Sequence, residues 1–146
     1  MIDYDVPSPD ERIVEPAAVA ARVDDWVGRL DALFADIRTW AEQHGWAAAE
    51  TPSIPMREEM MERAGLPERR QPMLRLEAEG GRYAWFKPKA LWVIGANGRI
   101  DLYTSAGIAV IVDVADAFDP PDWRIYRGPI KAEGQRFTPD LVPSLA

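Results

Sequence analysis

The sequence predicts an α+β protein in which a long N-terminal amphipathic helix and a short helix pack on an antiparallel β-meander of about five strands. Three observations support this fold class. Apolar residues recur at helical spacing through the first third of the chain, and from Met73 onward the apolar period changes to two. Glycine-containing turn signals separate the alternating runs, as in consecutive hairpins.

The length of 146 residues suits a single domain. We expect an irregular acidic arm at residues 1–14, because Pro7 and Pro9 stand among acidic residues there. The domain itself would then span residues 15–146. It divides into a helical part at 15–66, a sheet part at 73–127 and a C-terminal tail at 128–146.

The first helix is predicted to begin at Pro16 and to end near His44. Proline suits the first turn of a helix, and Gly45 suits a left-handed residue just after the last turn. Between them, apolar residues alternate in steps of four and three, which places them on one stripe. The stripe comprises Val19, Val23, Trp26, Leu30, Leu33, Ile37 and Trp40. At 1.5 Å per residue this helix is roughly 42 Å long.

A helix of that length can extend past a small sheet, which leaves two interpretations of its stripe. In one, the N-terminal part of the stripe forms a seam with a second copy of the chain, as a homodimer. That seam comprises Val19, Val23, Trp26 and Leu30. In the other, which we favour because coiled coils usually sustain more heptads, the whole stripe packs on the protein's own sheet.

A short second helix is predicted at residues 55–64, after a linker at residues 46–55. Ser53 precedes it as a cap, and Gly65 follows it in the position that ends helices. Residues 67–72 then form a polar connector.

The first predicted hairpin turns at Gly80-Gly81. Counting outward from a two-residue turn places Leu76 opposite Trp85. One face of the hairpin is then apolar and the other is mixed, as in a sheet that is covered on one side.

The second predicted hairpin turns at Asn97-Gly98, within the run ALWVIGANGRIDLYT. This dipeptide is a strong signal for a two-residue turn, because both of its residues tolerate positive φ. The resulting pairs on one face are Trp92 with Tyr103 and Ile94 with Asp101. Further strands are predicted at residues 108–112 and 123–127.

The composition excludes several kinds of site. The chain has no cysteine and one histidine, so it has no disulfide, no thiolate nucleophile and no site that needs two imidazoles. The formal net charge is −7, and residues 1–66 carry 14 acidic against 6 basic side chains. Direct binding of nucleic acid, which needs basic clusters, is therefore disfavoured. The acidity suits a basic protein partner, or it simply aids solubility, which is the interpretation that we prefer.

Our expectations on the cell compartment and on bound ligands rest on signals that the sequence lacks. The acidic start has no apolar signal core, and no apolar run is long enough to span a membrane, so we expect a cytoplasmic protein with no membrane contact. A phosphate loop at Asn97-Gly98 is disfavoured, because neither a lysine nor a helix follows the turn. We expect no cofactor.

Three carboxylates are weak candidates for a metal site: Asp101, Asp113 and Asp116. Asp101 stands in a strand among aromatic residues, so a metal-dependent nuclease or hydrolase is one alternative function. The later acids, from Asp113 to Asp122, match no EF-hand spacing and are more typical of a solvated loop. Because no nucleophile–base pair is evident, we lean away from an enzyme.

The preferred function is a non-catalytic module that binds a protein partner, as immunity proteins, antitoxins, chaperones and inhibitors do. One long helix covers only one sheet face, which leaves Trp92, Ile94 and Tyr103 exposed unless the short helix or the tail covers them. The acidic helical half offers a second surface, with Asp24, Asp25 and Asp31. A small-molecule pocket between the helix and the sheet is a third interpretation.

Overall fold

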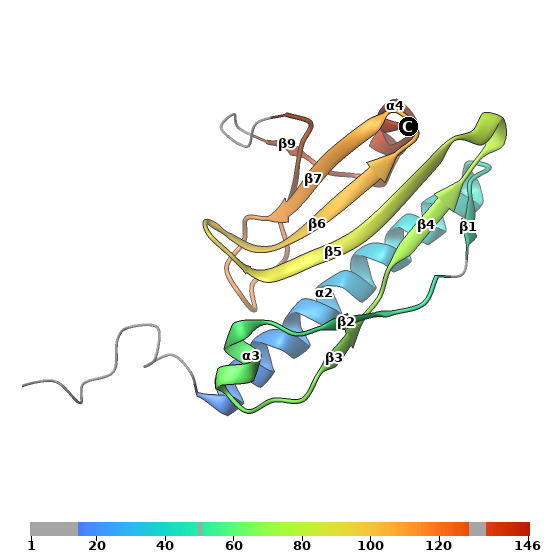
Figure 1. Cartoon of the computed structure of the whole chain (residues 1–146). Helices are drawn as coiled ribbons and strands as arrows, with labels where there is room; N and C mark the ends of the chain where they lie inside the picture. Colours follow the sequence, from blue (N-terminus) through green and yellow to red (C-terminus); the bar gives the residue numbers. More distant parts are fainter. Residues whose placement is uncertain (1–14, 50, 129–133) are drawn as a thin grey trace, which may run out of the picture.

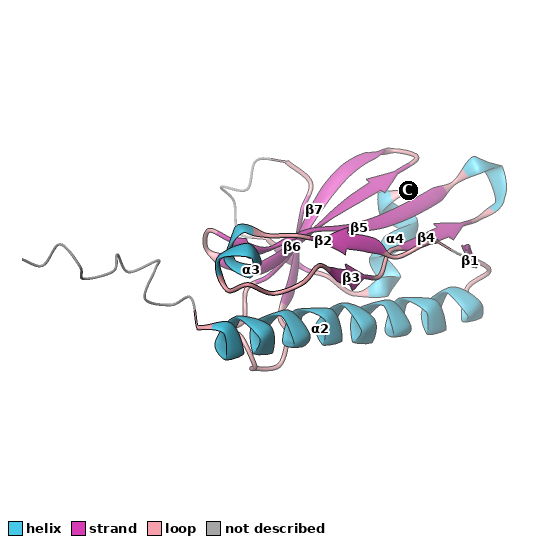
Figure 2. Cartoon of the chain, turned by 60° about the horizontal axis from the view of Figure 1, so that its bottom comes forward, coloured by secondary structure: helices cyan, strands magenta, loops and turns pink. Residues whose placement is uncertain are grey.

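The computed structural model describes residues 15–49, 51–128 and 134–146. A long helix, α2 (Pro16–Gln43), lies along one face of a seven-stranded antiparallel sheet (Figure 1, Figure 2). The predicted α+β class, with its long N-terminal helix, is confirmed. The arm predicted at residues 1–14 lies outside the described residues.

The sheet has the strand order β1-β4-β5-β6-β7-β8-β9. Its strands are β1 (Ala47–Ala49), β4 (Leu74–Glu77), β5 (Tyr83–Val93), β6 (Ala96–Thr104), β7 (Gly107–Asp113), β8 (Trp123–Tyr126) and β9 (Gln135–Arg136). Five of them, β4 to β8, form the predicted meander. The other two are short edge strands in the segments predicted as linker and tail, where two or three residues are too few to show a period.

Helix α2 begins at the predicted proline and ends one residue before His44. His44 is the C-cap, and Gly45 follows it in a left-handed conformation, with φ of 74°. The residues of the proposed dimer seam, Val19, Val23, Trp26 and Leu30, are all buried in the protein's own core. They are therefore not available to a second copy, and the favoured interpretation, packing on the sheet, is the one that the structure shows.

The second helical segment is shorter than predicted. Residues Ile54–Met56 form strand β2, which pairs with β3 (Arg69–Gln71), and the helix α3 spans only Glu59–Arg63. The predicted helix at 55–64 is thus wrong in its first turn, because its first two residues, Pro55 and Met56, pair with the segment predicted as a connector. Met61 of α3 is buried against the core.

The first hairpin turns through a short 3-10 segment, η2 (Glu79–Gly81), rather than through two glycines alone. Leu76 consequently pairs with Ala84, and Trp85 pairs with Arg75. The predicted pairing of Leu76 with Trp85 is wrong by one residue. Since side chains alternate between faces, that one-residue difference moves Trp85 to the face opposite Leu76.

The second hairpin turns at Ile94-Gly95 rather than at Asn97-Gly98. Val93 pairs with Ala96 across this turn, Gly95 has a φ of 80°, and Asn97 and Gly98 lie inside β6. Gly98, with φ of 102°, is needed there for a different reason. A Cβ on it would lie 2.1 Å from the Trp26 ring.

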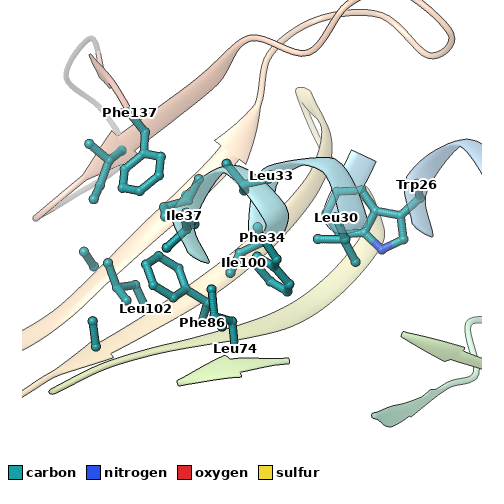
Figure 3. Packing of buried hydrophobic residues seen from close by; sticks show 14 of the residues in the cluster. Trp26, Leu30, Leu33, Phe34, Ile37, Leu74, Phe86, Ile100, Leu102 and Phe137 are labelled. Carbon is teal, nitrogen blue, oxygen red and sulfur yellow. The ribbon is translucent and has the colours of Figure 1, made fainter. Parts of the chain in front are cut away.

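The core lies between α2 and the sheet (Figure 3). The Phe34 ring packs on Phe86 of β5, and Phe86 packs in turn on Phe137, with centroid distances of 6.1 Å for each pair. The C-terminal elements η3 (Pro139–Leu141) and α4 (Val142–Leu145) close the same core, where Val142 and Leu145 are buried. All these elements contribute to one layer, on the α2 side of the sheet.

Candidate functional site

The side of the sheet turned away from α2 carries a group of aromatic and cationic side chains. We call it the open sheet face and define it by Arg75, Tyr83, Trp85, Lys87, Tyr103 and Ile108. The pairing of strands β4 to β7 places four of these residues side by side, in the order Arg75, Trp85, Tyr103 and Ile108. None of the six belongs to the core cluster, and no described helix lies on this side of β4 to β7 (Figure 2).

Cations stack on the aromatic rings of the open sheet face. The Lys87 Nζ lies 3.6 Å from the centroid of the Trp85 ring and 5.2 Å from that of Tyr103. The Arg75 guanidinium lies 4.6 Å from the ring of Tyr83 and 5.2 Å from that of Trp85. Each exposed cation–π contact of this kind contributes about 0.5–1 kcal/mol. Together they order the side chains of this face.

The charges of this face are largely paired within it. Arg75 contacts Glu77 at 2.9 Å, and Arg99 contacts Asp101 at 2.7 Å. Ile108, beside Tyr103, is 65% exposed. The Trp85 Nε1 is buried beneath its neighbours and has no hydrogen-bond acceptor among the described residues. The face is therefore apolar and aromatic in character rather than strongly charged.

Of the aromatic residues predicted to bind a partner, the structure separates Trp92 from Tyr103. Trp92 pairs with Asn97, and Tyr103 pairs with Trp85, so the predicted Trp92–Tyr103 pair is wrong. Ile94 is fully exposed, but at the hairpin tip and not beside Asp101. The cause is the turn at Ile94-Gly95, which shifts the register by several residues.

The predicted acidic surface on α2 is partly used within the chain. Asp24 forms an ion pair with Arg69 of β3, and Asp25 contacts Arg29 at 2.7 Å. Asp31 is exposed and has no partner within the described ranges. One free carboxylate of the three makes this surface a weaker candidate than the open sheet face.

The metal candidates do not come together. Asp101 lies opposite Lys87 and is paired with Arg99. Asp113 is completely buried and contacts Arg29 at 2.6 Å, so it belongs to the core and the predicted solvated loop is wrong at this residue. Asp116 accepts a hydrogen bond from Arg29 through its backbone carbonyl. Over residues 15–49, 51–128 and 134–146, no three acidic or histidine side chains gather closely enough to hold a metal ion.

A groove opens at the start of α2, between that helix, α3, the end of β5 and the loop after β7. We call it the helix-start groove; its volume is about 510 Å³. Its lining consists of Ala18, Val19, Ala21, Arg22, Met60, Trp92 and Phe118. Arg22 is the charged residue of this lining, and its guanidinium lies 5.3 Å from the Trp92 ring.

The comparisons add no family. No protein-family model, no curated protein and no solved structure matches this chain. Within the part of the chain that the structure describes, no helix is both long enough and apolar enough to cross a membrane.

Sequence reasoning missed two features of these surfaces. A two-residue Gly-Gly turn predicts Trp85 on the same face as Leu76, which is the covered face. The actual turn is one residue longer, so Trp85 lies on the other face. The groove was expected only in outline, as a pocket between helix and sheet. The sequence did contain an indication that Arg22 is partly buried. It precedes the apolar Val23, so it lies at the border of the apolar stripe of the helix, where an arginine can bury its aliphatic stem.

Proposed function

We propose that this protein is a non-catalytic interaction module that binds a protein partner through the open sheet face. The single observation that carries the proposal is the row Arg75–Trp85–Tyr103–Ile108, an aromatic and apolar strip on a sheet face that no described helix covers. Cytoplasmic location remains part of the proposal.

The composition of the face favours a protein over other partners. Interfaces between proteins are enriched in aromatic residues and arginine, and their binding energy concentrates in a few such residues. The cations of the face are mostly engaged with carboxylates or rings, so little free positive charge remains for a phosphate backbone. The expected partner therefore docks an apolar patch here, and the earlier expectation of a basic partner rests only on the helical half.

Capture from lysate of the native host, with mass spectrometry, tests the proposal with three variants. Ile108→Glu places a charge at the exposed β7 end of the strip and should leave the fold intact. Ala32→Glu is the matched control, because Ala32 is exposed on α2, on the other side of the molecule. Asp31→Lys probes the acidic helix surface.

We expect one stoichiometric partner that the wild type and Ala32→Glu retain and Ile108→Glu loses by at least about tenfold, the equivalent of 1.4 kcal/mol. If the Asp31→Lys variant loses the partner and the Ile108→Glu variant retains it, the interface is on helix α2 and not on the open sheet face. Capture that disappears in EDTA would instead favour the metal-dependent alternative at Asp101.

A further inference from the structure

The helix-start groove has the size and lining of a small-molecule site. Its volume of about 510 Å³ falls in the range of ligand pockets, which are mostly apolar with a few placed polar groups. Alanines of α2 line one side, and Met60, Trp92 and Phe118 line the others. Phe118 is 62% exposed and holds a left-handed backbone, with φ of 70°, which is unusual for a bulky residue.

Arg22 is a partly buried cation on the wall of this groove. Burial lowers its pKa, and the charges of Asp25 and Glu58 offset that effect only in part. Its Nη2 donates to the Asn97 Oδ1 at 3.0 Å, whereas its Nε is buried and has no acceptor in the described chain. No carboxylate of the described residues forms an ion pair with it.

Asn97 supplies a second donor of the same kind. Its side chain is buried, with 5% exposed, and its Nδ2 has no acceptor among the described residues. It stands opposite Trp92 in the register of β5 and β6. Arg22, which lines the groove, and Asn97, which accepts its hydrogen bond but does not line the groove, thus each hold a buried N–H donor without an acceptor. Buried donors without acceptors cost free energy, which an incoming oxygen acceptor would recover.

The nearby carboxylates do not fill this role. The Glu58 carboxylate accepts hydrogen bonds from the backbone N–H groups of Leu91 and Trp92, at 2.9 and 3.0 Å. Asp25 is engaged with Arg29. The Arg22 guanidinium is therefore without a carboxylate partner among the described residues.

From the cation on its wall, which has no carboxylate partner among the described residues, and from its apolar lining, we propose that the helix-start groove binds a small monocarboxylate with an aliphatic tail. The carboxylate pairs with the Arg22 guanidinium, because charge-assisted hydrogen bonds of this kind are the strong ones. The tail lies along Ala18, Met60 and Trp92. This site is separate from the open sheet face and does not depend on the proposed protein partner.

Isothermal titration calorimetry of the full chain tests the site with three probes that share a tail. They are decanoate and decyltrimethylammonium, each kept below its critical micelle concentration, and decanol, kept below its solubility limit. We expect decanoate to bind one to one, at least about tenfold more tightly than decanol, because the alcohol lacks the charge that pairs with Arg22. The cationic probe should not bind. Equal affinity for decanoate and decanol, or no binding of decanoate, would overturn the proposal.

Variants distinguish this site from general apolar binding. Arg22→Gln should weaken decanoate binding by at least about tenfold and leave decanol unchanged. Ala18→Glu places a carboxylate four residues before Arg22 on the same helix face, so it should occupy the guanidinium and exclude decanoate while keeping the fold. Arg38→Gln, on the exposed side of the same helix, is the matched control and should bind as the wild type does. Unchanged decanoate binding in both groove variants, with melting temperatures near that of the wild type, would refute the assignment.

Discussion

A single buried guanidinium, that of Arg29, joins α2 to the loop that follows β7. Its Nη1 contacts the Asp113 carboxylate at 2.6 Å, its Nε contacts Asp25, and its Nη2 donates to the backbone carbonyls of Asp116 and Asp119. Asp113 also accepts hydrogen bonds from the N–H groups of Ala115 and Asp122. One arginine therefore fixes the conformation of the acidic loop.

Removing this guanidinium should destabilise the protein strongly. Arg29→Met leaves the Asp113 carboxylate buried without its cation, and the loss of one partner from a buried ion pair costs about 3–5 kcal/mol. Urea unfolding followed by circular dichroism measures the free energy of unfolding. Arg38→Met, at an exposed position of the same helix, should change it by no more than about 0.5 kcal/mol. Equal effects of the two substitutions would show that the network contributes little.

Individual residues were the hardest features to predict from the sequence. Asp113 was expected in a solvated loop, because four acids at three-residue spacing indicate exposure when no partner is visible. Its partner, Arg29, is distant in the chain, and only the packing of α2 on the sheet brings the two together. The one local trace was the four-residue spacing of Asp25 and Arg29, which predicts a helical pair but not burial.

At the scale of elements, helix α2 and the order of the strands were predictable, and the registers of the hairpins were not. Its proline start, glycine end and alternating apolar steps are local signals that extend over many residues. Register, in contrast, depends on which two residues form each turn. Asn97-Gly98 has the residue types of a turn, but its glycine serves contact with the Trp26 ring instead. Trp26 belongs to a helix that is distant in the chain, so the hairpin sequence alone does not indicate this contact.

The position of Gly98 under the Trp26 ring gives a direct test of this register. Gly98→Ala should lower the free energy of unfolding by about 2–4 kcal/mol, because the added methyl overpacks the core and the backbone has positive φ. Gly28→Ala is the control, since nothing lies within 4 Å of a Cβ there and alanine favours a helix. We expect this control to be neutral or slightly stabilising in the same urea titration. A Gly98→Ala variant as stable as the wild type would contradict the packing of β6 on α2.

For the whole molecule, the fold class was predictable because it depends on the change from helical spacing to strand alternation in the apolar residues. That change can be recognised even when individual turns are placed wrongly. The same change predicted one covered and one uncovered sheet face. It could not identify the residues of the uncovered face, since a one-residue error in the first hairpin moved Trp85 to the wrong side. The aromatic pair of that face is Trp85 with Tyr103, and Trp92 lines the groove instead.

The two surfaces also divide the molecule by chemistry. The open sheet face is aromatic, and most of its charges are paired within it, as suits a protein partner. The helix-start groove is concave and apolar with one unpaired cation, as suits a small ligand. They share no defining residue, so substitutions in one should leave binding at the other unchanged.

The most direct test of the central claim, that the open sheet face contacts a protein, is site-specific photo-crosslinking in the native host. Ile108 and, as the control, Ala32 are each replaced by benzoylphenylalanine, and the crosslinked species are resolved by electrophoresis and identified by mass spectrometry. We expect one discrete protein adduct from position 108 and none from position 32. A discrete adduct from position 32 with none from position 108 would contradict it.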